Sequence, residues 1–190
     1  MIVEKTRAFA KENHDSEGFK YHILPVVKNA MLLAKKLHAD LEVVETAAFL
    51  HDIGVAAKIA EFEVENDHHI TGSEIAGEFL QKTGCKKEFI EKVKHCILAH
   101  RGRKGPKPET LEAEIIANAD AMAHFESFLT IFGYFLKTTS SFEEAVVEVE
   151  KKMQRDWNKK LTLPEAKEIV KPKYEAIMLV LKSTMEYFEK

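Results

Sequence analysis

The stretch AAFLHDIGV, residues 47–55, carries an apolar helical pattern into two polar side chains. At about 100° per residue, His51 falls on the same helix face as Ala48, so a face that points inward ends in an imidazole. Asp52 follows directly, and Gly54 is a typical residue for ending a helix. The stretch therefore predicts a helix that ends in an inward-facing histidine beside an aspartate.

The same helical period extends over the rest of the chain. Apolar residues recur three and four positions apart in nearly every segment, and no stretch alternates at period two for long enough to predict a sheet. We therefore predict an all-α fold, a helical bundle of about seven to nine helices. The expected helices are residues 2–13, about 23–37, 41–51, 72–82 and 87–100, an apolar stretch at 111–137 broken near Gly133, and two tail helices from about residue 141.

Capping residues place two of these helix starts. Asp40 is a plausible N-cap for the helix that ends near His51. Thr71 and Glu74 have the spacing of a capping box, which predicts a helix start near residue 72. His68 and His69 would then lie just before that helix.

Composition limits the class of protein. The chain has 190 residues, 45% of them hydrophobic, which is enough for a core, and a net charge of -3, so no global field attracts nucleic acid or an acidic membrane. We expect no nucleic-acid duplex and no membrane as partner. Two cysteines and the absence of an apolar leader at the N-terminus predict a cytoplasmic location.

The length favours one domain. We predict a single domain over residues 1–190, with a core at roughly 15–135 and a C-terminal helical extension at 141–190. The basic segment RGRKGPKP, residues 101–108, is the best candidate for a linker because it is the only stretch rich in both charge and Gly or Pro.

Three further polar residues fall on or near apolar helix faces. His22 lies at the margin of the face that includes Val26, and Asp120 stands in the apolar run IIANADAMA. On the helix over 87–100, His100 lies near the centre of the apolar face, whereas His95 points nearly the opposite way. Because a buried carboxylate without a counter-charge is costly, we expect a cationic group near Asp120.

Each of these residues also has an ordinary structural interpretation. A single histidine is more often a core or boundary residue than a metal ligand, and we keep that interpretation for His14, His38 and His95. His124 is a weak candidate for the same site as Asp120, and His68 and His69 compete for one role. The remaining features are interpreted structurally: a solvated basic loop, two structural cysteines, Cys85 and Cys96, and a stripe of Phe128, Ile131, Phe132 and Phe135 that serves in the core or at a subunit interface.

The motifs in their order resemble the HD superfamily of metal-dependent phosphohydrolases. The pattern is His22, then AAFLHDIGV, HHITGSEIA at 68–76, CILAH at 96–100, and IIANADAMA at 115–123. The resemblance covers roughly residues 15–135. It implies an all-helical fold that holds one or two divalent metal ions, with Mn, Fe, Mg, Zn or Co as candidates.

The resemblance also implies the ligands. The first ion would be bound by His22, His51, Asp52 and Asp120. In members that hold two metals, the aspartate of the His-Asp doublet, here His51 and Asp52, bridges the two ions. His69 and His100 match the positions that bind the second ion. Two departures are visible: Val55 replaces a lysine that often follows the doublet, with Lys58 as a substitute, and Asn118 replaces a second distal carboxylate.

The implied activity is hydrolysis of a phosphate ester, with Asp52 as the central catalytic carboxylate. Arg101 and Arg103 are the nearest candidates for clamping phosphate, because a guanidinium donates two parallel hydrogen bonds. The substrate would be a small phosphorylated molecule such as a nucleoside monophosphate, a dinucleotide polyphosphate or a cyclic dinucleotide. Two alternative functions are a di-iron oxygenase of the same fold and a non-catalytic nucleotide-binding regulator. A homodimer is a further possible assembly.

Overall fold

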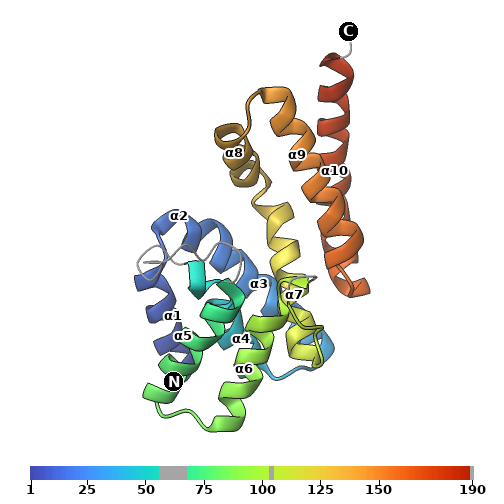
Figure 1. Cartoon of the computed structure of the whole chain (residues 1–190). Coiled ribbons are helices and arrows are strands. Elements are labelled where there is room, and N and C mark those ends of the chain that lie inside the picture. Colours follow the sequence, from blue (N-terminus) through green and yellow to red (C-terminus); the bar gives the residue numbers. More distant parts are fainter. Residues whose placement is uncertain (56–67, 103–104, 189–190) are drawn as a thin grey trace. The chain divides into compact units, whose positions relative to one another are not determined.

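The computed structural model describes residues 1–55, 68–102 and 105–188. These residues are helical and contain no strand, which confirms the all-α prediction (Figure 1). In chain order the elements are α1 (Ile2–Asn13), α2 (Ser16–Gly18), a π-helix (Phe19–Ile23), α3 (Leu24–Leu37), α4 (Leu41–Leu50), a 3-10 turn (Ile53–Val55), α5 (His68–Lys82), α6 (Lys87–Ala99), α7 (Leu111–Glu126), α8 (Phe128–Thr138), α9 (Phe142–Arg155), a second π-helix (Asp156–Lys160) and α10 (Pro164–Phe188).

The chain forms two compact units, Met1–Asp120 and Ala121–Lys190. The division falls inside α7 and so lies before residue 141, where we expected the C-terminal extension to begin. In the first unit α5 packs against α6, α3 packs against α4, and α4 contacts both α1 and α6. Its fully buried apolar side chains include Val26, Leu33, Val44, Leu50, Leu80, Ile97 and Ile115.

The start of α4 confirms one capping prediction. The Asp40 carboxylate accepts hydrogen bonds from the backbone N–H groups of Glu42 and Val43, both at 3.2 Å. A side-chain cap of this kind satisfies N–H groups that have no partner within the helix. It sets where α4 begins, and therefore which residues stand at its end.

The start of α5 differs from our prediction. The helix begins at His68 instead of near residue 72, so both histidines lie in its first turn. The 3-10 turn after α4 lies against this turn: a Cβ atom at Gly54 would overlap the carbonyl oxygen of His68 and lie 2.8 Å from the Gly72 nitrogen. Only glycine fits at such a close backbone contact. This contact holds the segment that contains His51 and Asp52 against the start of α5.

The break between α7 and α8 also differs from our prediction. It lies at Ser127, whereas Gly133 is inside α8. The Ser127 hydroxyl donates a 2.7 Å hydrogen bond to the carbonyl of Ala123, and such local side-chain bonds bend or interrupt helices.

The second unit packs α9 against both α8 and α10. Ser141 caps α9 by accepting a 3.1 Å hydrogen bond from the Glu144 nitrogen. The buried apolar residues of this unit include Val146, Val149, Met153, Val170 and Leu181. Among the described residues of the whole chain, no helix combines the length and apolar character needed to cross a membrane.

Candidate metal centre

His51 follows the last residue of α4, and its ring is completely buried. Its Nδ1 donates a 2.9 Å hydrogen bond to the carbonyl of Ala48, because a carbonyl oxygen can only accept. This bond fixes the ring and leaves Nε2 pointing at the groups of the candidate centre. Such orientation through the second ring nitrogen is typical of histidines that bind metals.

The first π-helix carries His22 to the same place. Its Nε2 lies 3.1 Å from His51 Nε2 and 3.0 Å from Asp52 Oδ2. Asp120, from α7, places Oδ1 3.6 Å from His22 Nε2 and is only 5% exposed. Four side chains that lie up to 98 positions apart in the sequence thus converge in the first unit. The ring of His22 stands where we expected a cationic group near Asp120.

The other oxygen of Asp52 faces a second group of histidines. Asp52 Oδ1 lies 3.4 Å from His68 Nε2 and 3.3 Å from His100 Nε2. His100, at the end of α6, donates from Nδ1 to the carbonyl of Ile97 at 2.6 Å, as His51 does to Ala48. The carboxylate of Asp52 therefore lies between two sets of imidazole nitrogens.

The structure places His68 at this second position, where we expected His69. His69 is 3% exposed, and its Cδ2 lies 3.5 Å from the position that a Cβ atom on Gly105 would take. Adjacent residues on a helix point about 100° apart, so only one of the two can face Asp52. The choice follows from α5 starting four residues earlier than its capping pattern predicts.

The contacts within the cluster require a cation. A neutral imidazole that donates from Nδ1 presents a lone pair at Nε2, and an ionised carboxylate only accepts. In His51 and His100 that lone pair would face an Asp52 oxygen at 3.4 and 3.3 Å, which is repulsive unless a proton or a metal ion lies between them. Imidazole and carboxylate groups are the ligands that Zn, Mn and Fe prefer. The donor set therefore fits a divalent metal.

The pKa values follow the same electrostatics when the cation is a proton. Burial lowers the pKa of His51, but the Asp52 charge and hydrogen bond outweigh it and raise the pKa to about 9. Burial raises the pKa of Asp52, while the His51 charge and hydrogen bonds from His100 and His22 hold it well below its usual range. Burial is the main cause that lowers the pKa of His68 to about 4.

The ligand atoms fall into groups compact enough for ions. The donor atoms of His22, His51 and Asp52 all lie within 4.8 Å of one another, and so do those of Asp52, His68 and His100. Asp52 belongs to both groups. This arrangement fits one ion in each group, with Asp52 shared.

Arg101 directly follows His100 and is partly buried. Its charge is one of the causes that lower the pKa of His68, after burial. Arg103 and Lys58, which we also considered for phosphate contact, lie outside the described residues. Val55 is exposed, and Asn118 is buried and donates to the carbonyl of Glu114 at 2.9 Å.

The remaining histidines and cysteines have other surroundings. His95 Nε2 accepts a 3.0 Å hydrogen bond from the backbone N–H of Glu109, so it anchors the segment that follows the basic loop. His124 Nδ1 bonds to Asp156 Oδ2 at 2.8 Å within the second unit. Cys96 is buried, and burial raises the pKa of its thiol to about 12.

His14, which we interpreted as a core or boundary residue, is the C-cap residue of α1. It is partly buried, and burial is the main cause that lowers its pKa, followed by the charge of His51. Its only sequence signal is that it precedes His22 by eight positions in a helical region.

Two solved structures resemble most or nearly all of the chain in fold. An HD-superfamily hydrolase from Bacillus thuringiensis matches 99% of this chain and 97% of its own, with a TM-score of 0.72 and 19% identity. A predicted HD superfamily hydrolase from an uncultured Thermotogales bacterium matches 83% of this chain and 92% of its own, with a TM-score of 0.55 and 24% identity. At these identities the likeness establishes the fold.

Sequence comparison shows the family. Ribonuclease Y of Lawsonia intracellularis is 33% identical over 102 residues, which are 54% of this chain and 17% of that protein, so the chain spans about a sixth of its length. An uncharacterized protein of Clostridium beijerinckii is 37% identical over 103 residues, 60% of its length. The HD domain family matches residues 19–124, a range that contains every histidine and aspartate of the cluster, and the chain therefore belongs to the HD domain family.

Proposed function

We propose that this protein is a metal-dependent phosphohydrolase that cleaves a phosphate ester, in a nucleotide or a related phosphorylated small molecule. The observation that carries the proposal is the position of Asp52 between two groups of imidazole nitrogens, at 3.0 Å from His22 and 3.3 Å from His100. Two metal ions that share a carboxylate are a recurring arrangement in phosphate-ester hydrolysis. Membership of the HD domain family supports the same activity.

Six residues of this chain would hold the ions. The first ion would be bound by His22, His51, Asp52 and Asp120, and the second by Asp52, His68 and His100. In this set His68 takes the place of His69, the residue we expected from the sequence. When bound, such ions lower the pKa of a coordinated water toward about 7 and polarise the phosphoryl oxygens. Ala48 and Ile97 keep the rings of His51 and His100 oriented through their carbonyl groups.

Arg101 would bind the phosphate group itself. A guanidinium donates two parallel hydrogen bonds to a phosphate and stays charged at all relevant pH values. In support, Arg101 directly follows His100, and its charge is one of the causes, after burial, that lower the pKa of His68. Its role is to orient the ester and to offset the negative charge that develops during cleavage.

The test is a screen for phosphate-ester cleavage by the Mn²⁺-loaded protein. The substrates are a nucleoside monophosphate, a dinucleotide polyphosphate, a cyclic dinucleotide and a short RNA, the last because of the likeness to Ribonuclease Y. We expect cleavage of at least one, lost in Asp52→Asn and retained in His95→Ala, which changes a histidine outside the cluster. Oxygen uptake by the reduced iron form without cleavage would instead identify an oxygenase, and tight nucleotide binding without either reaction would identify a regulator.

A further inference from the structure

A second feature of the first unit is a pocket between α1 and residues 16–24. It has a volume of about 710 Å³, and its lining includes Glu4, Arg7, Lys11, His14, Phe19 and Lys20. Positions 4, 7 and 11 lie on one face of α1, because residues three and four apart are neighbours on a helix. The other side of the pocket is lined by residues between Ser16 and Leu24, and His22 lies within this segment.

The lining of this pocket is electropositive. Arg7, Lys11 and Lys20 are exposed, and within the described part of the chain none of them forms a salt bridge. The one carboxylate of the lining, Glu4, is already engaged at 3.0 Å by the N-terminal ammonium group of Met1. Three cations around one cavity attract an anion with several negative oxygens.

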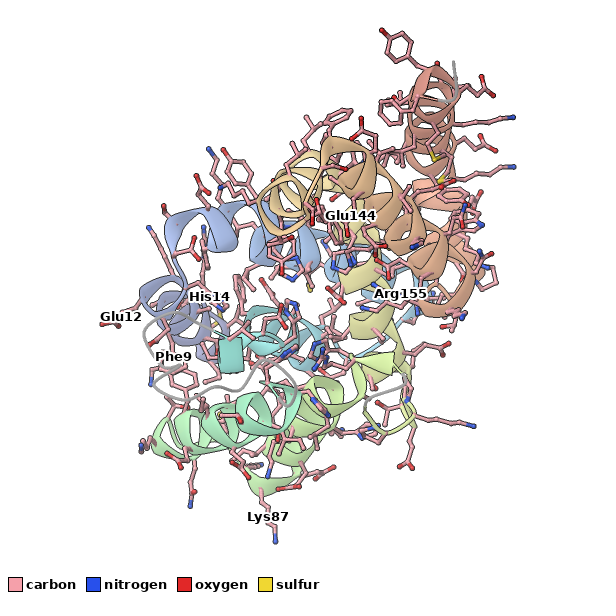
Figure 2. The ribbon with its side chains drawn as sticks, turned by 45° about the horizontal axis from the view of Figure 1, so that its top comes forward. Phe9, Glu12, His14, Lys87, Glu144 and Arg155 are labelled. Atoms are coloured by element: carbon pink, nitrogen blue, oxygen red, sulfur yellow. The ribbon has the colours of Figure 1, made fainter. Side chains whose placement is uncertain are left out.

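His14 relates this pocket to the candidate metal centre. Its Nε2 is buried and has no hydrogen-bond partner among the described residues, which is unusual for a buried polar atom. Burial lowers the pKa of His14 to about 4, and the next cause is the charge of His51, in line with the packing of α1 against α4. In Figure 2 Glu12 lies at the outer edge of the view while His14 lies further inward. His14 therefore lines the pocket from the end of α1, the helix that packs against the one ending before His51.

We propose that this pocket is a second phosphate subsite, which holds a further phosphate group of the substrate while the ester to be cleaved lies at the metal centre. The substrate would then carry two or more phosphate groups. This identification of the ligand as substrate rests on the proposed function. Residues 7, 11 and 14 precede the matched range 19–124, so this subsite adds residues that the HD domain itself does not include.

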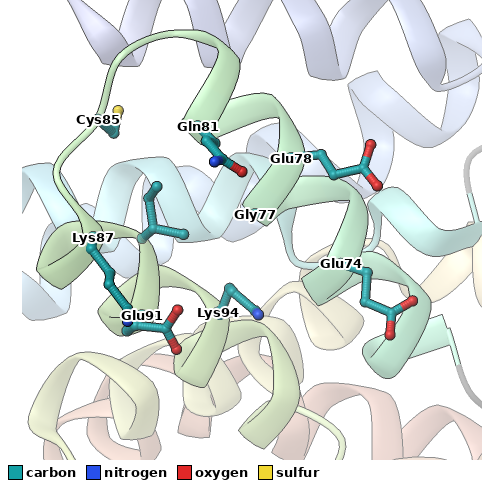
Figure 3. Close-up of a pocket in the computed structure, with 9 residues that line it drawn as sticks. Glu74, Gly77, Glu78, Gln81, Cys85, Lys87, Glu91 and Lys94 are labelled. Carbon is teal, nitrogen blue, oxygen red and sulfur yellow. The ribbon is translucent and has the colours of Figure 1, made fainter.

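A pocket between α5 and α6 also has charged walls, but it lacks the excess of basic side chains that would favour an anion. Figure 3 shows acidic and basic side chains lining the same space, with Glu74, Glu78 and Glu91 alongside Lys87 and Lys94. Their charges offset one another, and none of the candidate ligands lines it. It carries no comparable preference for an anion.

The experiment compares two probes by calorimetric titration of the Mn²⁺-loaded full chain. One probe is deoxyadenosine monophosphate, with one phosphate, and the other is a two-nucleotide DNA with a 5′-phosphate, which has two. The test variant is Arg7→Gln/Lys11→Gln, with Lys20→Gln as an independent second variant. The control is Lys5→Gln, which removes one exposed charge from α1 outside the pocket lining.

We expect the wild type to bind the two-phosphate probe at least about tenfold more tightly than deoxyadenosine monophosphate. The double variant should lose most of this preference and keep its affinity for the monophosphate within about twofold, while Lys5→Gln keeps the preference. Equal binding of both probes by the wild type would overturn the subsite and leave the hydrolase proposal standing. An equal effect of Lys5→Gln would also overturn it, since net charge would then be the cause.

A last variant separates a substrate subsite from an independent anion site. His22→Ala disrupts the metal centre. It should therefore lower the affinity for the two-phosphate probe if that probe spans both the pocket and the metal centre. Unchanged affinity in His22→Ala would show that the pocket binds its anion separately and would overturn the substrate assignment. A preserved preference in the wild type without any cleavage activity would refute the hydrolase proposal and the assignment of the ligand as substrate, and would leave the phosphate-binding pocket standing.

Discussion

Asp52 Oδ1 lies 3.3 Å from His100 Nε2, although the His100 ring already donates from its other nitrogen to the carbonyl of Ile97. Two acceptors at this distance need a cation between them, either a proton or a metal ion. We therefore expect the stability of the first unit to depend on which cation the cluster holds.

Removal of the metal should destabilise the protein. Without an ion, Asp52 and Asp120 stand close to His22 in a largely buried cluster, and buried charge without compensation is costly. We expect exhaustive chelation to lower the melting temperature by about 5 °C, as a change of about 1–2 kcal/mol does in a chain of this size. Differential scanning calorimetry with Mn²⁺ re-addition measures it. An unchanged melting temperature after verified metal loss would contradict the coupling.

Replacement of His100 should remove metal, whereas replacement of His95 should not. His100→Ala deletes a donor that faces Asp52, so we expect the metal content to fall from about two ions per chain toward one, with a sharp loss of turnover. His95→Ala loses only the hydrogen bond from Glu109, which costs about 1 kcal/mol of stability. Elemental analysis and denaturant unfolding of both variants decide. Full metal content in His100→Ala would exclude it as a ligand.

Two adjacent histidines provide an equally close comparison. His68→Ala should lower the metal content in the same way as His100→Ala, because His68 Nε2 lies 3.4 Å from Asp52 Oδ1. His69→Ala should lower stability, since the ring is buried, and keep the metal. The two variants are compared by metal analysis at equal folded fraction. The opposite result would restore His69, the residue expected from the sequence.

Gly54 should be intolerant of any side chain. In Gly54→Ala the added methyl group overlaps the His68 carbonyl and approaches the Gly72 nitrogen, both of them backbone, so the first turn of α5 has to move. We expect a loss of about 2–3 kcal/mol in unfolding free energy, as for overpacking in a core, together with reduced metal content. Gly133→Ala is the control: nothing lies within 4 Å of its Cβ position, and alanine favours helix by about 1 kcal/mol. Equal stability of the two variants would refute the contact.

Asp156 should make the second unit sensitive to acid. Its side chain is fully buried, and it bonds to His124 at 2.8 Å and to Lys152 at 3.0 Å. Burial raises its pKa, but His124 and Lys152 outweigh this and hold the pKa well below its usual value of 3.8. A carboxyl with a lowered folded pKa stabilises above its unfolded pKa, and this stabilisation is lost as pH falls below about 4.

Asp156→Asn tests this directly. At pH 7 we expect a loss of about 3 kcal/mol, because the substitution leaves His124 and Lys152 without their anion. The difference from wild type should shrink as the pH is lowered from 4 toward 2. Urea unfolding at several pH values measures it, with Glu143→Gln, at an exposed position of α9, as the control. A difference that is independent of pH would assign the effect to packing instead of charge.

The local sequence determined most helix boundaries. The repeat of apolar residues predicted α1, α4 and α6 within about one residue, and the Asp40 cap was confirmed, because amphipathic periods and caps act within a few residues. The helix wheel also separated His100 from His95. These features need no knowledge of distant parts of the chain.

Tertiary structure decided the rest. The choice of His68 over His69 depends on where α5 begins, and Gly54, 14 positions earlier, packs against that turn. The meeting of His22 with Asp120 and the proximity of His14 to His51 depend on helix packing, which no local period encodes. The sequence by itself determined which side chains face inward. Packing alone decided which of them meet, because distances across a core depend on all the helices that pack there.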